Sequence, residues 1–473
     1  MAMLDPDLID QFVALAGPNG AVTDEHDLAP WLTDWRRRKT GRAAVMLQPE
    51  STDTLAAIVG LASRTGTALV PQGGNTGLVG GSVPEAAGDA ILVSLRRMNR
   101  IRDLDAAGDT VTAEAGVVLQ HLHEAAAAQG RMFPLSLGAK GSATIGGLIS
   151  TNAGGVQVLR YGTMRTQILG LEAVLPDGTV LDQLTPLRKD NTGLDIKQLL
   201  IGAEGTLGFV TAASLRLLSA PREVATAFVG IAEPGQGLSL LSRLKQATGD
   251  LVDSFELLPR AAVDLVTAHV PGTRDPLADA HKWYVLVEAT SSAAGETLRA
   301  ALENELAAAM DDGLIADAVI AENGTQRDEL WRLRESIAEA EKVDGLALKH
   351  DIAVPVSDVP RFIAEVTPAI EARWPGMSVF AFGHLGDGNL HYNVRSDARM
   401  PREMLMTHGP DVAVLVYDAV AGFGGSISAE HGIGTLKAAE LASRGDAGKL
   451  AAMRAVKAAL DPKGIMNPGK LFA

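Results

Sequence analysis

Short apolar runs alternate with amphipathic stretches along the first half of the chain. Val45–Leu47 and Thr67–Pro71 are apolar runs of the length that strands have. From Ser51 to Arg64 the apolar residues recur at spacings of three and four, which predicts a helix with one buried face. Further segments continue the alternation: strand-like Ile91–Leu95, Arg100–Leu104, Thr110–Ala115, Leu169–Leu175 and Thr179–Leu181, and an alanine-rich helix at Val117–Gln129. This irregular mixture predicts an α+β fold rather than a regular doubly wound sheet.

The second half of the chain shows the same mixture with longer helices. Strands are expected at Ala225–Ile231, Trp283–Glu288 and Leu346–Val354, and helices at Gly295–Met310 and Gln326–Lys342. A boundary is expected near Ser219–Pro221. The pattern therefore predicts a helical lead-in (1–42), a first domain (43–219), a second domain (220–424) and a helical C-terminal segment (425–473) that returns to the first domain.

Charge and composition exclude several classes of function. The 473 residues carry 42 Lys and Arg against 57 Asp and Glu, and the net charge of −15 argues against nucleic acid or a membrane surface as the main partner. Cysteine is absent, so any metal must be held by histidine and carboxylate, and this chain holds no iron–sulfur cluster. Met1–Gly17 contains no basic residue and no apolar run is long enough to span a bilayer. We therefore expect a cytoplasmic protein without a transmembrane segment.

Three glycine-rich stretches lie in the first half of the chain, at 71–84, 138–155 and 202–208. Glycine lets backbone N–H groups converge on an anion without obstruction by Cβ. The first stretch lacks the G-x-G-x-x-G spacing and the following helix of a Rossmann motif. One such stretch alone is equally well explained as a cluster of surface turns. Three together favour a large ligand with an extended anionic backbone, such as a dinucleotide.

The stretches read Pro-Gln-Gly-Gly-Asn-Thr-Gly from residue 71, Gly-Gly-Leu-Ile-Ser-Thr-Asn-Ala-Gly-Gly from 146 and Gly-Ala-Glu-Gly-Thr-Leu-Gly from 202. They resemble the FAD-binding domain of the vanillyl-alcohol oxidase and p-cresol methylhydroxylase superfamily, in its branch of D-lactate, glycolate and D-2-hydroxyglutarate dehydrogenases. The resemblance implies an FAD-binding domain of two α+β subdomains at 43–219 and a substrate domain with an antiparallel sheet at 220–424. Some superfamily members attach FAD through His or Cys. Residues 71–84 contain neither, so we expect non-covalent FAD.

The residues expected to bind FAD lie in these three stretches, except Val210 and Asn467. They are Pro71, Gln72, Gly73, Gly74, Asn75, Thr76, Gly77, Gly81, Ser82, Gly138, Lys140, Gly141, Ser142, Gly146, Gly147, Asn152, Gly154, Gly155, Glu204, Gly205, Gly208, Val210 and Asn467.

A candidate metal site lies at residues 380–394, where Asp387-Gly388 is a hairpin-turn signal between two strand-like arms. A two-residue turn there would place His384 directly opposite His391, with Cβ atoms about 5 Å apart. Both imidazoles could then reach one cation, and Glu430 could add a carboxylate. The alternative is a pair of hydrogen-bonded core histidines. In the proteins that this chain resembles, the matching residues bind a divalent metal; we expect zinc, with manganese, iron or cobalt as alternatives.

Two cations are candidate substrate ligands. Arg334 lies within the apolar stripe of its helix, so it needs a carboxylate partner, either internal or on the substrate. Lys349 shares a strand face with Asp351, and the two could simply form a surface pair. By resemblance, Arg334 and Lys349 match substrate-binding positions of D-2-hydroxyglutarate dehydrogenases, and His431 lies beside the flavin and the substrate. Asn393 is a further substrate-binding candidate because it projects from the same strand face as His391. Ala338 departs from the hydroxyl residue that this subgroup can carry.

The resemblance implies oxidation of a small D-2-hydroxy acid to the 2-oxo acid, with hydride transfer to flavin N5 and His431 as general base. The expected substrate is D-2-hydroxyglutarate, with D-malate, D-lactate and glycolate as alternatives. The electron acceptor would be an electron-transfer flavoprotein or a quinone, and the expected oligomer is a homodimer. Two rival interpretations are an alcohol or phenol oxidase without catalytic metal, and a non-catalytic FAD-carrying subunit of a glycolate-oxidase-like complex.

Overall fold

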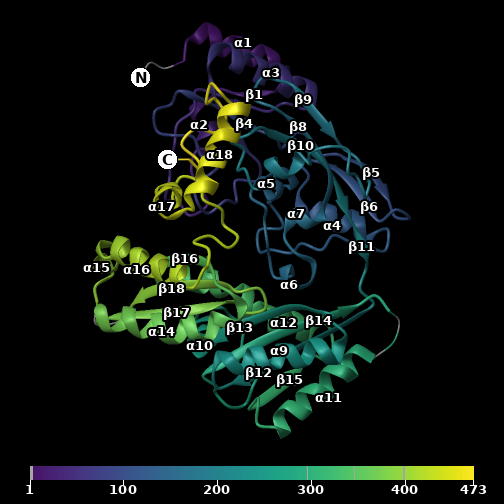
Figure 1. Cartoon of the computed structure of the whole chain (residues 1–473), viewed down its shortest axis with the longest axis vertical. Helices are drawn as coiled ribbons and strands as arrows, with labels where there is room; N and C mark the ends of the chain where they lie inside the picture. The colour runs from purple at the N-terminus through teal and green to yellow at the C-terminus, as the bar shows by residue number, and fades with distance from the viewer. Residues whose placement is uncertain (1–3, 294, 296, 346, 398–399, 473) are drawn as a thin grey trace. The chain divides into compact units, whose positions relative to one another are not determined.

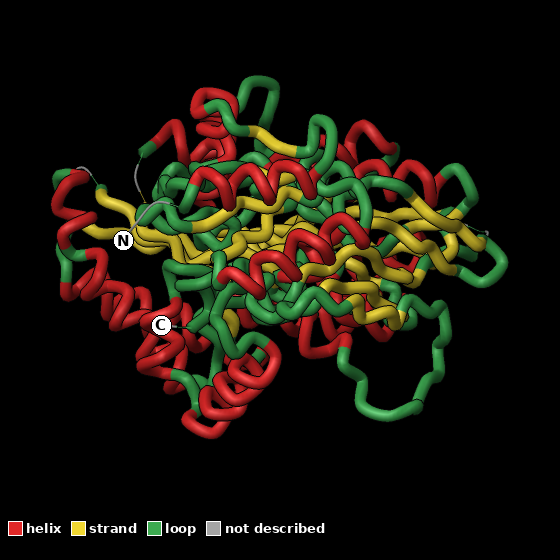
Figure 2. The backbone as a smooth tube through the Cα atoms, turned by 90° about the horizontal axis from the view of Figure 1, so that it is seen from above, coloured by secondary structure: helices red, strands yellow, loops and turns green. Residues whose placement is uncertain are grey.

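The computed structural model describes residues 4–293, 295, 297–345, 347–397 and 400–472. It divides into two compact units. Unit 1 consists of Met1–Ala153, Thr163–Ala220 and Glu430–Ala473, and unit 2 of Gly154–Gly162 and Pro221–Ala429. Figure 2 shows helices and strands interspersed along the chain, which confirms the predicted α+β class. Among the helices formed by the described residues, none is both long enough and apolar enough to cross a bilayer.

The first sheet of unit 1 has four strands in the order β1-β2-β4-β3, with β4 parallel to both β2 and β3. Its strands and the two helices packed beside it are β1 (Ala21–Val22), β2 (Met46–Leu47), β3 (Ala68–Gln72), β4 (Ala90–Ser94), α1 (Pro6–Ala16) and α3 (Thr52–Thr65). The predicted apolar face of α3 is fully buried and packs with Phe12 of α1. Burial of this face fixes α3 as the connection between parallel strands.

The second sheet of unit 1 is antiparallel and has five strands in the order β5-β6-β10-β8-β9. These strands are β5 (Ile101–Asp105), β6 (Thr110–Glu114), β8 (Ile168–Val174), β9 (Val180–Gln183) and β10 (Phe209–Arg216). The helices of this part include α4 (Leu119–Ala127), α5 (Ile145–Ser150), α17 (Ala438–Arg444) and α18 (Ala447–Leu460). Val456 and Leu460 of α18 pack on the apolar core of this sheet, so the C-terminal segment completes unit 1.

Unit 2 is built on a seven-stranded antiparallel sheet in the order β15-β12-β14-β13-β17-β18-β16. Its strands are β12 (Glu223–Ile231), β13 (Val252–Pro259), β14 (Trp283–Ser291), β15 (Asp317–Ile320), β16 (Ala347–Ala353), β17 (Met377–His384) and β18 (Asn389–Ser396). The strand expected from Leu346 is β16, although Leu346 itself lies outside the described residues. An antiparallel substrate sheet is the architecture that the sequence predicted.

Helices cover the two faces of this sheet unequally. One face carries the larger apolar core, to which α9 (Pro234–Thr248), α11 (Thr297–Asp311), α14 (Val359–Arg373) and α16 (Gly409–Gly422) contribute (Figure 1). The opposite face is covered by α10 (Arg260–His269), α12 (Gly324–Glu335) and α13 (Ile337–Asp344). On that face, His384 follows the apolar Phe380 and Phe382 along β17, and β18 contributes only polar side chains, Asn389, His391 and Asn393. The candidate site lies in this polar part of the face.

Two helices of unit 2 differ from those that the sequence predicted. The single helix predicted at Gln326–Lys342 is two helices, α12 and α13, separated at Ser336. Ser336 has φ −81° and ψ −4°, a turn-like backbone that serine tolerates because its side chain competes for local hydrogen bonds. The helix expected from Gly295 begins at Thr297, and Glu296 lies outside the described residues.

The predicted register of the histidine hairpin is wrong by two residues. His384 pairs with Asn389, and His391 pairs with Phe382. Asp387 and Gly388 belong to a four-residue connection in which both of their N–H groups donate to the His384 carbonyl. A two-residue type I′ turn needs positive φ at both central residues, and of these two only Gly388 has it, at 82°. His384 and His391 are therefore diagonal neighbours on one face rather than a direct pair.

A short segment leaves unit 1 and joins unit 2, which no pattern in the sequence predicted. It spans Gly154–Gly162 and contains α6 (Val158–Tyr161). Arg160 Nη1 donates to the buried carboxylate of Asp253 at 2.6 Å and to Thr290 Oγ1 at 3.1 Å. A Cβ on Gly386 would come within 2.8 Å of the Leu159 side chain, so this segment also packs against the connection between the two histidine strands.

Candidate cofactor cradle and metal–substrate face

The glycine-rich stretches that are far apart in the sequence meet within unit 1. A Cβ on Gly73 would lie 2.3 Å from Thr144 Oγ1, and one on Gly74 would lie 2.0 Å from the carbonyl oxygen of Ser142. Gly205 has φ +73°, and a Cβ there would lie 2.3 Å from Pro71 Cγ. Such approaches are possible only for glycine, so the first, second and third stretches form one packed cradle.

A fourth segment, near the C-terminus, joins this cradle through Asn467. Its Nδ2 donates to the carbonyl oxygen of Gly81 at 3.0 Å and to that of Glu204 at 2.7 Å. Asn467 is buried and adopts φ +45°, a left-handed conformation that asparagine tolerates better than most residues. Asn467 is therefore in contact with the predicted cofactor residues of the first and third stretches, although it lies far from them in the sequence.

Several predicted cofactor side chains brace the first loop internally. Ser82 Oγ donates to Asn75 Oδ1 at 3.0 Å, and Asn75 Nδ2 donates to the Thr33 carbonyl at 2.9 Å. Gln72 Nε2 donates to the carbonyl oxygens of Trp31 and Ser82, both at 2.9 Å. These side chains fix the loop and leave its backbone as the surface for a ligand.

The cradle contains buried polar atoms without hydrogen-bond partners and glycines that border open space. Within the described part of the chain, Gln72 Oε1, Thr144 Oγ1 and Asn467 Oδ1 are buried without a hydrogen-bond partner. A Cβ on Gly77, Gly138 or Gly141 would meet nothing within 4 Å, so these glycines border open space. Buried polar atoms without partners are rare unless a bound group satisfies them. The residues present therefore fit a dinucleotide cofactor.

The remaining predicted cofactor residues are distributed as follows. Thr76 lies in the first loop, exposed Lys140 precedes α5, Gly146 and Gly147 begin α5, and Gly208 immediately precedes β10, of which Val210 is a buried residue. Asn152 Oδ1 accepts a hydrogen bond from the Arg165 N–H at 2.9 Å. Gly154 and Gly155 open the segment that belongs to unit 2. Asn152 also borders the third stretch, since a Cβ on Gly202 would lie 3.4 Å from Asn152 Cβ.

Glu204 has a role that the sequence did not reveal. Its two carboxylate oxygens accept hydrogen bonds from the Ile433 and Gly434 N–H groups, both at 2.7 Å. Burial raises the pKa of this carboxyl group, while the two backbone N–H donors oppose the shift. A Cβ on Gly432 would lie 2.9 Å from Glu204 Oε1. Glu204 thus fastens the segment that directly follows Glu430 and His431.

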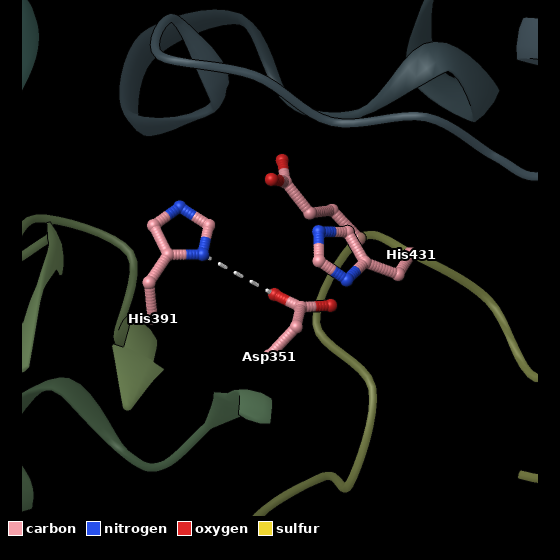
Figure 3. Close-up of side chains that lie close together, drawn as sticks. Asp351, His391 and His431 are labelled. Carbon is pink, nitrogen blue, oxygen red and sulfur yellow. Dashed lines mark ion pairs between the residues drawn. The ribbon is translucent and has the colours of Figure 1, made fainter. Parts of the chain in front are cut away.

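In unit 2, the two candidate metal-binding histidines lie on one face of the sheet, and each has a carboxylate nearby. Their ring centroids are 5.7 Å apart. His384 Nε2 lies 3.9 Å from Glu256 Oε1, and His391 Nδ1 lies 3.9 Å from Asp351 Oδ1. Figure 3 shows the second of these pairs. Asp351 also accepts a hydrogen bond from Asn389 Nδ2 at 2.9 Å.

This arrangement has the donors that a divalent cation requires. Imidazole nitrogens and carboxylate oxygens are ligands of zinc and related metals, and metal-binding histidines commonly face a second carboxylate. Glu256 and Asp351 are almost completely buried, and sequence reasoning did not propose either as part of the site. The signal was present, because each is a carboxylate at an inward position of an apolar strand.

Arg334 forms an internal ion pair but retains free donors. Its Nε donates to Glu256 Oε2 at 2.5 Å, and its guanidinium lies 5.1 Å from the centre of the Phe382 ring. The side chain is 11% exposed. Among the described residues, none accepts a hydrogen bond from Nη1 or Nη2 of this arginine. The internal partner considered in the sequence therefore exists, and it uses only one edge of the guanidinium.

Lys349 and Asn393 are cross-strand partners that share one carboxylate. Lys349 Nζ lies 2.7 Å from Glu341 Oε2, and Asn393 Nδ2 donates to Glu341 Oε1 at 2.9 Å. Glu341 is 2% exposed, whereas the Lys349 side chain is 21% exposed. The surface pair of Lys349 with Asp351 that the sequence suggested is wrong, since α13 brings a different carboxylate over the strand.

Glu430 and His431 follow the last residue of unit 2, Ala429. In unit 2, Ser426 is fixed to Ala353 of β16 by two backbone hydrogen bonds, at 2.7 and 3.0 Å. Four residues of extended chain span at most about 14 Å, so Glu430 must lie within that distance of Ser426. Ala353 is two residues from Asp351 on the same strand. Glu430 belongs to unit 1, whereas His384 and His391 belong to unit 2, so the predicted metal set takes residues from both units.

Comparison with known families assigns the chain. Residues 220–471 match the family model described as "FAD linked oxidases, C-terminal domain", and residues 43–183 match the one described as "FAD binding domain". The chain belongs to the FAD-linked oxidase family. The cradle in unit 1 thus corresponds to the FAD-binding part of the family, and the predicted class of flavin-dependent oxidoreductase is confirmed.

Relatives within the family align along nearly the whole chain. The mitochondrial D-2-hydroxyglutarate dehydrogenase of Arabidopsis thaliana is 39% identical over 470 residues, which cover 99% of this chain and 82% of that protein. The mitochondrial D-2-hydroxyglutarate dehydrogenase of Bos taurus is 40% identical, with 96% and 81% covered. The structure of p-cresol methylhydroxylase with substrate bound has a TM-score of 0.74 at 13% identity, covering 98% of this chain and 96% of that one. This last likeness confirms the predicted fold.

The prediction of a cytoplasmic location is wrong by this comparison, because these FAD-linked oxidase relatives are named as mitochondrial proteins. The prediction rested on charge and on the lack of a basic N-terminal stretch. The charge and apolar pattern of a folded oxidase report on its solubility and partners, and they do not determine its compartment.

The cradle packing makes a stability prediction for this oxidase. Gly74→Ala would force a Cβ against the Ser142 carbonyl, so we expect the free energy of unfolding to fall by about 1–3 kcal/mol and the FAD content to fall with it. Gly324→Ala is the control, since its Cβ would meet nothing within 4 Å and should change stability by less than about 0.5 kcal/mol. Denaturant unfolding and the flavin-to-protein absorbance ratio measure both effects. Equal stability of the two variants would contradict the packed cradle.

Proposed function

We propose that this protein is a metal-assisted dehydrogenase of D-2-hydroxy acids, with D-2-hydroxyglutarate as the substrate and non-covalent FAD as the oxidant. The observation that carries this proposal is the polar face of unit 2, where two imidazoles and two cations with unused donors lie on neighbouring strands and on the helices above them. The relatives named D-2-hydroxyglutarate dehydrogenase support the choice of substrate.

We assign His384, His391 and Glu430 as the residues that would hold the metal. Asp351 and Glu256 would orient the two imidazoles, as carboxylates beside metal-bound histidines commonly do. A bound divalent ion, zinc in this proposal and manganese, iron or cobalt as alternatives, supplies an electrophile that lowers the pKa of a coordinated hydroxyl group. The two-histidine, one-carboxylate set leaves positions open for substrate.

Arg334 and Lys349 would orient a dicarboxylate substrate. Arg334 can offer Nη1 and Nη2 as a bidentate donor pair, because Glu256 takes only its Nε. Lys349 has three donors, of which Glu341 takes one, and Asn393 beside it adds polarity to the same strand face. Two cations are suited to two carboxylates, which favours D-2-hydroxyglutarate over D-lactate or glycolate.

His431, labelled in Figure 3, would accept the proton of the substrate hydroxyl on a ring nitrogen. Bound FAD supplies the acceptor for the hydride that leaves the substrate α-carbon. Glu204 would keep the base in place, because it fastens Ile433 and Gly434 directly after His431. A separate electron-transfer flavoprotein or quinone would reoxidise the flavin, since a chain without cysteine carries no iron–sulfur relay of its own.

Anaerobic flavin bleaching tests this proposal. The yellow protein is mixed with D- and L-2-hydroxyglutarate, D-malate, D-lactate and glycolate, with and without a chelator, and the visible flavin band is followed. We expect D-2-hydroxyglutarate to bleach the flavin fastest and the chelator to abolish bleaching. Protein that stays yellow with every acid would instead favour a non-catalytic FAD-carrying subunit, and bleaching by an alcohol or phenol despite chelator would favour the metal-free oxidase.

Lys349 is expected to discriminate the dicarboxylate from the monocarboxylate. Lys349→Met should lower kcat/KM for D-2-hydroxyglutarate roughly 10- to 100-fold, because a hydrogen bond between charged groups is lost, and should change kcat/KM for D-lactate little. Lys245→Met, which removes a surface lysine paired with Asp250 at 3.7 Å, is the matched control and should leave both values unchanged. Equal losses for the two acids would show that Lys349 has no role in substrate choice.

A further inference from the structure

We infer that Glu256 is a positioning residue that holds both the substrate-binding Arg334 and the metal-binding His384, so that one buried carboxylate couples the two functions. The inference rests on the proposed function and extends it to a residue that lies behind the metal–substrate face. Glu256 itself would contact neither metal nor substrate.

The position of Glu256 in the sheet places it between these two residues. It lies on β13, in register with His384 of the neighbouring β17, so the two side chains share one face. The Glu256 side chain is completely buried. Oxygen Oε2 accepts the hydrogen bond from Arg334 Nε at 2.5 Å, and oxygen Oε1 lies 3.9 Å from His384 Nε2.

A second ion pair on the same face, between Arg327 and Glu288, serves as a comparison because its role is structural. Arg327 precedes Arg334 by seven residues, about two helical turns, so α12 presents both to the sheet. Arg327 binds Glu288 in a bidentate manner, through Nε at 2.6 Å and Nη2 at 2.8 Å. Thr226 Oγ1 and Trp331 Nε1 each donate to Glu288 Oε2 at 2.7 Å. Both oxygens of Glu288 are therefore occupied by protein donors.

Glu256 differs from Glu288 because one of its carboxylate oxygens lacks a hydrogen-bond donor. Its Oε1 is buried and has no hydrogen-bond partner among the residues that the structure describes. A buried carboxylate oxygen without a donor is costly, and such atoms are commonly satisfied in the functional state of a site. His384 Nε2 lies 3.9 Å from this oxygen, and His384 Nδ1 lies 3.5 Å from Asp387 Oδ2. A shift of about 1 Å would bring Nε2 to hydrogen-bonding distance of Glu256 Oε1.

The arrangement also explains why Arg334 is bound through one edge only. Glu288 takes Nη2 of its arginine as well as Nε, whereas Glu256 takes only Nε of Arg334, so both Nη1 and Nη2 of Arg334 keep their donors for another group. Glu256 can thus orient Arg334 toward a substrate carboxylate while its second oxygen orients the imidazole of His384 toward the metal.

Zinc affinity of the metal-stripped protein, measured by competition with a chromophoric chelator, tests the inference without relying on turnover. We expect Glu256→Gln to weaken zinc binding roughly 10- to 100-fold, and to raise KM for D-2-hydroxyglutarate. Glu288→Gln is the matched control, a buried glutamate paired with the same helix, and it should lower the melting temperature while leaving zinc affinity and KM unchanged. Zinc affinity in Glu256→Gln equal to that in Glu288→Gln would overturn the inference.

Arg334→Gln separates the two functions of Glu256. It leaves the contact between Glu256 and His384 available, so it should raise KM while zinc affinity remains within about threefold of the wild-type value. If Arg334→Gln weakened zinc binding as much as Glu256→Gln does, the effect on zinc would come from loss of the Arg334–Glu256 ion pair and not from the contact between Glu256 and His384. This result would overturn the inference.

A retained flavin band and a cooperative melting curve verify folding of each variant. If Glu256→Gln does not fold, Glu256→Asp replaces it, because the shorter carboxylate keeps its charge for Arg334 but withdraws from His384. Zinc affinity should then fall more than substrate affinity, and unchanged zinc affinity would overturn the inference. A wild-type protein that binds no zinc would overturn the proposed function as well, so the two failures are distinguishable.

Discussion

Metal-stripped protein is expected to lose its turnover with D-2-hydroxyglutarate by about a thousandfold while remaining yellow, and readdition of zinc or manganese should restore it. The magnitude corresponds to the several kcal/mol that a metal contributes when it polarises a substrate oxygen. The flavin should stay bound because the cradle residues belong to unit 1, whereas His384 and His391 belong to unit 2. Turnover is measured with an artificial electron acceptor before and after dialysis against a chelator.

His391→Ala should reproduce the stripped state, and added metal should not rescue it. His350→Gln is the matched control, since His350 is on the next strand but points its Nδ1 to the Tyr392 carbonyl at 3.0 Å and packs against the Tyr417 ring. This control should lose stability and retain metal dependence. Turnover in the stripped protein equal to that of the untreated protein would favour the metal-free oxidase.

His431→Ala is expected to lower kcat by 10²- to 10⁴-fold, the range typical of removing a general base, with FAD content and zinc affinity preserved. The rate of flavin reduction by D-2-hydroxyglutarate should fall by the same factor, because the hydroxyl proton then has no positioned acceptor. Stopped-flow measurement of flavin reduction provides this rate.

The control for this prediction is His26→Ala, which removes an exposed histidine from the first turn of α2 (Glu25–Leu28). It should retain the wild-type rate of flavin reduction. Near-normal flavin reduction in His431→Ala would remove its role as base and direct attention to other polar groups of the face, such as Lys349 or Asp351.

The sequence predicted the elements of the fold well because their signals are local. The apolar spacing of α3, the apolar runs of β3, β4 and β12 and the turn signal after β17 all correspond to elements that the structure contains. The hairpin between β17 and β18 shows the limit of such signals. Asp-Gly predicts a turn, but its length depends on whether Asp387 adopts positive φ, which the surrounding strands decide.

The partners of charged residues were less predictable, since they depend on strand order. Glu256 is 78 positions from Arg334 in the sequence, and only the order β14-β13-β17 brings it beside His384. Likewise, Lys349 pairs with Glu341 of α13, a contact between a helix and a strand that no local pattern in the sequence predicts. A buried carboxylate in an apolar strand can be recognised in the sequence, but the residue with which it pairs cannot.

The glycine-rich stretches illustrate an intermediate case. Their number predicted a dinucleotide cradle, and the close approaches at Gly73, Gly74 and Gly205 are contacts that only glycine permits. What the sequence did not reveal is that several polar side chains nearby serve the protein rather than a ligand. Glu204 is the clearest example, because its carboxylate binds the backbone that follows His431.

One metal ion and one substrate are expected to meet at the polar face of unit 2. An anomalous-scattering map from crystals grown with zinc and D-2-hydroxyglutarate tests this expectation most directly. We expect one strong peak about 2.1 Å from a nitrogen of both His384 and His391 and close to a Glu430 oxygen, with a substrate carboxylate on Arg334. A peak elsewhere, or density for substrate without any metal beside these histidines, would contradict it.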